Sequence, residues 1–193
     1  GVRKLLGAWL KELIDLVLAR EEGKKIVYYG FPAILGPGLM LSASSEDVFV
    51  SAPDMVLDHT MGQIFNKLKP ILEAGEANGL PPGHALCSLW QAKVGGIALG
   101  MIPMPDLGLA SSYYCDMGSK ADDLVTALHG VPMAYIDGIM DNAWGEYPEY
   151  PPERVHYLGA RIDEALKKAE DLLHSARESE SRILKTVHQK IEG

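Results

Sequence analysis

The two cysteines are the residues of this chain whose type and position most directly suggest chemistry. Cys87 lies near the expected start of a helix, and Cys115 follows an apolar segment that is typical of a buried strand. Backbone N–H groups at the start of a helix favour the thiolate form of a cysteine. The carboxyl ends of strands in open parallel sheets commonly bind ligands. Both thiols are therefore candidate metal or cofactor ligands, with burial as structural thiols the alternative.

His84 extends this set of candidate ligands. The pair His84 and Cys87 has the spacing of metal ligands, and together with Cys115 it would offer three donors to zinc. No second closely spaced pair follows, which speaks against a zinc site. The other histidines form neither a His-x-x-x-His nor a His-Glu-x-x-His motif.

The hydrophobic pattern predicts an alternation of helices and strands around the two cysteines. We expect strands over residues 25–29, 48–51, 107–111 and 131–137, and helices over 2–20, 39–43, 64–77, 84–99, 118–129 and from 153. The strand–helix–strand order between residues 107 and 137 requires a right-handed parallel crossover. The sequence therefore predicts a three-layer α/β domain with a mainly parallel four-stranded sheet, plus N- and C-terminal amphipathic helices.

Three local signals refine the expected helices. Ser119 is expected to cap the helix over 118–129, with Asp122 in the capping-box position three residues later. Pro70 is expected to break or restart the helix over 64–77 near its middle. The Gly95-Gly96 pair indicates close approach of another backbone, which we interpret as tight packing of a helix on the sheet.

Length and composition limit the class of protein. With 193 residues, 47 % of them hydrophobic, the chain can form one domain with a sizeable core. A net charge of −8 without a Lys/Arg cluster speaks against nucleic-acid binding, and no apolar run reaches the length of a membrane span. Two cysteines without an Asn-x-Ser/Thr sequon indicate a reducing cytoplasm. We expect an N-terminal helix (1–24), an α/β lobe (25–140), a Pro- and aromatic-rich connector (141–152) and a C-terminal helical arm (153–193).

Four segments, taken in order, resemble one known family. They are CSLWQAKVGG at 87–96, PDLGLA at 105–110, CDMGSK at 115–120 and GVPMAYID at 130–137. This order is similar to that of the 2-hydroxyacyl-CoA dehydratase / benzoyl-CoA reductase subunit family. That family shows a cysteine at a helix start, a "PDL" strand ending near a "CD" pair, and a "G-(I/V)-P" strand ending in Asp. The resemblance covers residues 25–161 and corresponds to the first α/β lobe of such a subunit.

The resemblance implies a cofactor and its ligands. Family subunits have two α/β lobes and hold an iron–sulfur cluster through three cysteines. Cys87 and Cys115 correspond to two of those ligands, and this sequence contains no third cysteine. The resemblance therefore implies a cluster, most simply of the 4Fe–4S type, that is completed by a ligand outside this chain.

The resemblance also implies a reaction and partners. The expected activity is that of a lyase that dehydrates 2-hydroxyacyl-CoA reductively, or of an oxidoreductase that reduces an aromatic acyl-CoA. Both reactions need an electron at very low potential, which a thiolate-bound cluster can deliver. The expected partners are the acyl-CoA substrate, a second subunit and an ATP-hydrolysing activator protein as electron donor. The chain itself contains no P-loop motif, which agrees with ATP chemistry in another protein.

Two other interpretations stay open at this point. The chain could be a cluster-free interaction lobe whose N- and C-terminal helices dock on a partner subunit. It could also be a zinc or redox-thiol domain that uses His84, Cys87 and Cys115.

Overall fold

The computed structural model describes residues 1–30, 35–80, 87–111, 115–138 and 152–173. Their central element is a four-stranded sheet built from β1 (Lys25–Tyr29), β2 (Val48–Ser51), β3 (Leu107–Ala110) and β4 (Met133–Tyr135). The strand order is β2-β1-β3-β4, and every neighbouring pair is parallel. All four expected strands are present, with β3 and β4 shorter than expected. The predicted parallel α/β fold is confirmed.

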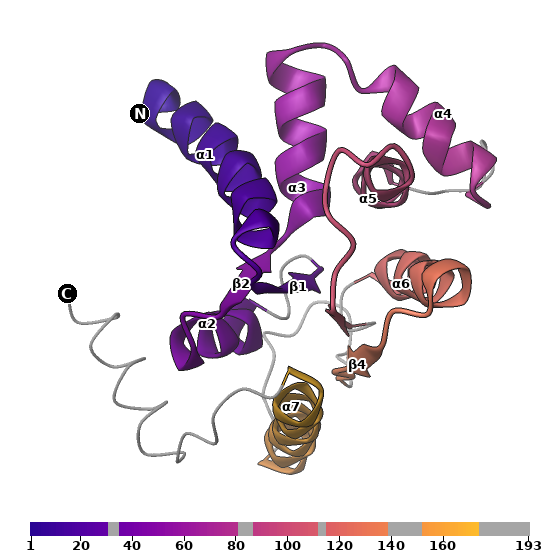
Figure 1. The fold of residues 1–193 in the computed structure, drawn as a ribbon. Coiled ribbons are helices and arrows are strands. Elements are labelled where there is room, and N and C mark those ends of the chain that lie inside the picture. The colour runs from indigo at the N-terminus through magenta and orange to yellow at the C-terminus, as the bar shows by residue number, and fades with distance from the viewer. Residues whose placement is uncertain (31–34, 81–86, 112–114, 139–151, 174–193) are drawn as a thin grey trace.

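Helices cover both faces of this sheet (Figure 1). One face carries α1 (Val2–Glu21), α3 (Pro53–Asp58), α5 (Ser88–Ala98) and α6 (Asp116–His129), with α4 (Lys69–Ala77) packed on the outside of α5. The opposite face carries α2 (Leu35–Ser44) and α7 (Pro152–Leu173), and α7 contacts β3 and β4 directly. Side chains alternate between these layers: Ile26 and Tyr28 enter the core under α5, whereas Val27 enters the core under α7.

The chain between β2 and α5 differs from the expected helix over 64–77. The π-helix η1 (His59–Ile64) continues directly from α3, and the helical path then ends at Asn66, which has a φ of 51°. Pro70 lies in the first turn of α4, where a missing N–H costs no hydrogen bond, so it starts this helix instead of breaking it.

α5 is buried on almost all sides, and its two glycines explain how. A Cβ at Gly95 would lie 1.8 Å from the backbone oxygen of Ile71 in α4, and one at Gly96 would lie 2.4 Å from Leu57 Cδ2 in α3. The reciprocal contact is at Gly75 of α4, where a Cβ would lie 2.7 Å from the backbone oxygen of Gln91. Close approach of a backbone is confirmed, but the expectation of helix–sheet packing is wrong: the approaching backbone belongs to a helix.

Asp106, from the PDLGLA segment, fastens the start of β3 to its neighbours. Its carboxylate accepts hydrogen bonds from the Ile26 N–H at 2.8 Å and from Arg20 of α1 at 2.9 Å, and Lys25 lies 3.4 Å away. Burial raises the pKa of Asp106, but these three partners outweigh that effect and lower it overall. This acidic residue therefore joins α1, β1 and β3 at the amino end of the sheet.

No helix in the described part of the chain is long and apolar enough to cross a membrane.

Candidate functional site

Each cysteine occupies the N-cap position of a helix. Cys87 precedes α5, which begins at Ser88 and not at residue 84, and its side chain is exposed. Cys115 precedes α6, five residues after the last residue of β3, and is half-buried. Both thiols are free, and neither side chain makes a capping hydrogen bond. Both positions therefore leave the sulfur available to a ligand.

The indole of Trp90 joins the two helix starts. Trp90 lies three residues after Cys87, and Gly118 lies three residues after Cys115. A Cβ at Gly118 would lie 2.8 Å from Trp90 Cζ2, and one at Gly30, directly after β1, would lie 3.0 Å from Cη2. Glycine at both positions lets the ring fill the space between the carboxyl end of β1 and the first turn of α6. The first turns of α5 and α6 thus meet through the Trp90 ring, beside the carboxyl end of β1.

A buried ion pair lies beneath this contact. Lys93 Nζ of α5 donates a hydrogen bond to Asp122 Oδ1 of α6, and the two side chains are only 2 % and 7 % exposed. The ammonium also lies 4.8 Å from the centroid of the Trp90 ring, within the range of a cation–π contact. Burial raises the pKa of Asp122, and Lys93 counteracts part of that rise.

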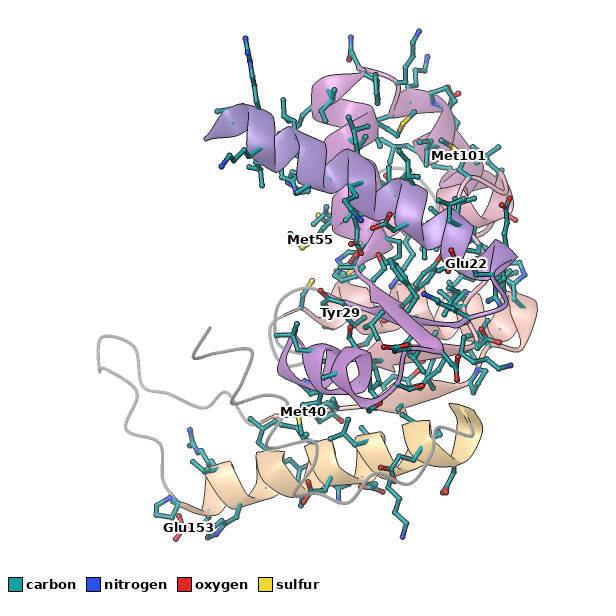
Figure 2. All side chains as sticks on the ribbon, turned by 60° about the vertical axis from the view of Figure 1, so that its left-hand side comes forward. Glu22, Tyr29, Met40, Met55, Met101 and Glu153 are labelled. Carbon is teal, nitrogen blue, oxygen red and sulfur yellow. The ribbon has the colours of Figure 1, made fainter. Side chains whose placement is uncertain are left out.

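Asp54 is the third buried charge of this region. It lies three residues after β2, is 0 % exposed, and neither carboxylate oxygen has a hydrogen-bond partner in the described structure. Burial raises the pKa of Asp54 to about 6, and Lys93 is the strongest influence in the opposite direction. Figure 2 labels its neighbours at this end of the sheet, Met55 and Tyr29. Burial also raises the pKa of Tyr29, with Glu12 and Asp54 adding to the effect.

The raised pKa of Asp54 predicts how the stability of the protein changes with pH. A raised folded-state pKa means that the native protein holds a proton which the unfolded chain releases above its ordinary pKa of about 4. Wild-type stability is therefore expected to fall as pH rises from about 4 to about 6, by about 3 kcal/mol for this group. In Asp54→Asn this part of the pH dependence should disappear. Urea unfolding of both proteins across pH 4 to 7 measures the difference, and parallel curves would contradict the prediction.

The expected capping box of α6 is wrong. The helix begins at Asp116, two residues earlier than expected, so Cys115 and not Ser119 takes the N-cap position. Ser119 Oγ is buried without a hydrogen-bond partner in the described residues. Asp122 lies too far inside the helix to serve its N-terminus and is used instead to bind Lys93. The Ser-x-x-Asp pattern therefore does not mark a helix cap here, because Asp122 contacts the neighbouring helix α5 instead.

The structure places two of the candidate ligands at the starts of neighbouring helices. It places Cys87 and Cys115 on adjacent helix starts, whereas His84 lies outside the described residues. Within the described ranges no group of three His, Cys, Asp or Glu side chains is placed to hold a metal ion. Two soft thiol donors fit part of the ligand set of an iron–sulfur cluster, for which cysteine is the usual ligand. They do not complete it, so a cluster bound here would need further ligands from outside the described residues.

Lys93 and Asp54 are the residues that our sequence interpretation missed. Lys93 lies inside the segment WQAKVGGIA, in which every other residue is apolar, small or an uncharged amide. A single charge in a segment that is buried all round requires a buried partner, and this signal was available. Asp54 offered no such signal, because an acid at the start of a helix is ordinarily exposed to solvent.

No protein-family model matches this chain, and no curated protein matches it either.

Proposed function

We propose that this chain supplies two thiolate ligands, Cys87 and Cys115, to an iron–sulfur cluster of the 4Fe–4S type. The enzyme we propose dehydrates a 2-hydroxyacyl-CoA reductively or reduces an aromatic acyl-CoA. The observation that carries the proposal is the placement of both free cysteines at N-cap positions of adjacent helices, α5 and α6, at one edge of a parallel sheet. The four sequence segments that resemble the dehydratase family supply the reaction class.

The surroundings of the thiols suit such a ligand. The positive ends of the α5 and α6 dipoles meet at this edge and favour a negatively charged group. The buried Trp90 ring fills the space between the two helix starts with apolar surface, which leaves little room for water beneath them. When bound, an iron–sulfur cluster supplies an electron at low potential. The chain's own contribution is to bind and orient it.

The proposed partners follow from the chemistry. Two cysteines leave part of the cluster without protein ligands, so a second subunit or lobe is proposed to supply the remainder. The acyl-CoA substrate is proposed to bind at the same sheet edge, and an ATP-hydrolysing activator is proposed as the electron donor. We propose the cytoplasm as the compartment, because free thiols persist in a reducing environment.

One surface favours a second candidate function, a cluster-free interaction lobe. An open apolar groove of about 320 Å³ lies along α1, beside α3 and Met101. Met101 is labelled in Figure 2. Ile14, Val17 and Leu18 of α1 line it and are 58 %, 40 % and 45 % exposed. A large exposed apolar surface commonly marks a protein interface. This observation supports docking on a partner without requiring a cluster.

Iron binding by the reconstituted protein tests the proposal. We expect the chain, purified without oxygen and incubated with Fe²⁺ and sulfide, to become brown and to retain iron. Cys87→Ser and Cys115→Ser should each lose most of that iron, because a hydroxyl is a much poorer ligand than a thiolate. The measurements are the visible absorption spectrum and the iron and sulfide content after gel filtration.

Met104→Ser is a matched control for the loss of a sulfur atom. Met104 lies at the opposite, amino end of β3 and is 37 % exposed, so iron retention should equal that of the wild type. Iron that survives both cysteine substitutions would contradict the proposal. A colourless protein with stoichiometric zinc would support the zinc domain, and tight partner binding by a metal-free protein would support the interaction lobe.

A further inference from the structure

Lys93 and Asp122 lie at similar distances along their helices from the two cysteines. Lys93 is six residues after Cys87 on α5, and Asp122 is seven residues after Cys115 on α6. At a rise of about 1.5 Å per residue, each charged side chain lies about 10 Å along its helix from the thiol. The pair therefore joins α5 to α6 about two turns inside the helix starts that carry the candidate ligands.

Trp90 connects this ion pair to the helix starts. Its ring receives the Lys93 ammonium at 4.8 Å and contacts the backbone at Gly118 in the first turn of α6. Trp90 is only 3 % exposed, so its ring is enclosed between the two helices and β1. A shift of α5 relative to α6 would have to break the ion pair and move this ring together.

Stability alone does not account for a buried ion pair in this place. Removing two charges from water is expensive, and well-packed apolar residues in the same space are often equally stable or more so. A hydrogen-bonded pair has one property that apolar side chains lack, because its donor and acceptor must align. Leucine and methionine side chains can slide past one another, whereas a shift of α5 along α6 would strain or break this hydrogen bond.

We propose that Lys93 is a positioning residue which, through Asp122 and Trp90, fixes the placement of Cys87 relative to Cys115. The inference rests on the proposed function only for the reason why the two thiols should converge, which is that they would bind one shared ligand. The geometry itself involves no iron and can be tested without it.

Crosslinking of the two thiols by dibromobimane tests this inference on the full, metal-free chain. Each thiolate displaces one bromide from the reagent, and strong fluorescence develops when both bromomethyl groups have reacted. The wild type is expected to form an intramolecular crosslink, which Cys87→Ser and Cys115→Ser cannot form. In Lys93→Met/Asp122→Leu we expect crosslinking to slow by about tenfold, because small misplacements of reacting groups cost large factors in rate.

Two further measurements separate positioning from simple destabilisation. The double variant should recover most of the stability that Lys93→Met alone loses and remain folded at the assay temperature, so slower crosslinking would reflect a lost register and not unfolding. Leu16→Ala removes a fully buried side chain of α1 and should melt lower while crosslinking at the wild-type rate. Wild-type crosslinking in the double variant, slowing by Leu16→Ala of the same size, or no crosslink in the wild type would each overturn the inference.

The same experiment stays distinguishable from the test of the proposed function. A wild type that crosslinks rapidly but retains no iron contradicts the cluster and supports the positioning role of Lys93. A wild type that retains iron through both cysteines, with a double variant that crosslinks equally fast, supports the cluster and contradicts the positioning role.

Discussion

Gly95→Ala is expected to destabilise the protein severely. A Cβ at this position would lie 1.8 Å from the backbone oxygen of Ile71 and 3.0 Å from the backbone nitrogen of Gly75. Backbone atoms cannot rotate away as a side chain can, so α4 and α5 would have to separate. Overpacking of this kind costs about 3 kcal/mol or more, against which the propensity gain from alanine is small. Thermal unfolding followed by circular dichroism should show a melting temperature lowered by about 10 °C.

Gly159→Ala is the matched control in another helix. Gly159 lies within α7, and a Cβ there would have no neighbour within 4 Å. The same change of residue should therefore stabilise the protein by about 1 kcal/mol through helix propensity alone. Equal effects of the two substitutions would show that α4 and α5 are not in the close contact described above.

The sheet was predictable from sequence because its signals are local. The run Lys25–Tyr29 is β-branched and aromatic and is bounded by glycine, and 107–111 is apolar on both faces, so each segment identifies itself. Gly130, with a φ of 69°, ends α6 as a left-handed residue, a role that glycine serves at the ends of many helices. These features depend on few neighbours, and the structure confirms them.

The helix contacts were not predictable in the same way. The Gly95-Gly96 pair indicates close approach, but no pattern within α5 says whether a sheet or another helix approaches. Asp122 fits a capping box locally, and only the position of Lys93 on another helix shows its real partner. The placement of the two cysteines at helix starts was predictable, since it depends on where strands and helices end. The ion pair behind them depends on how α5 packs against α6, which lies beyond local pattern.

Lys93→Met is expected to be the second severely destabilising substitution. It would leave Asp122 and Asp54 buried without the cation that offsets their charges. Removing one partner of a buried ion pair costs about 3–5 kcal/mol, because the remaining charge stays unpaired in the interior. Urea unfolding at neutral pH measures this loss, which should appear in the midpoint while the slope of the transition stays unchanged.

The pH dependence of this variant has a definite sign. Without Lys93, both acids should titrate further above their ordinary pKa of about 4, so the folded state holds protons that the unfolded chain releases. The loss of stability should therefore be small near pH 4, where unfolded carboxyl groups are half protonated, and should grow as pH rises. A loss that is constant with pH would mean that the missing methylene and ammonium contacts, and not unpaired acids, cause it.

The second substitution at Asp122 separates charge from packing. Lys93→Met/Asp122→Leu removes both charges and refills the space between α5 and α6 with side chains of similar size. Apolar replacements of buried ion pairs are often neutral or stabilising. The double variant should therefore recover most of the stability that Lys93→Met loses, and much of the pH dependence that Lys93→Met adds should disappear. Asp54 would remain buried in it, so a residual fall in stability above pH 4 is expected, and adding Asp54→Asn should remove that fall. If the double variant regains stability but its two thiols crosslink slowly, the role of Lys93 is to fix the register of α5 against α6.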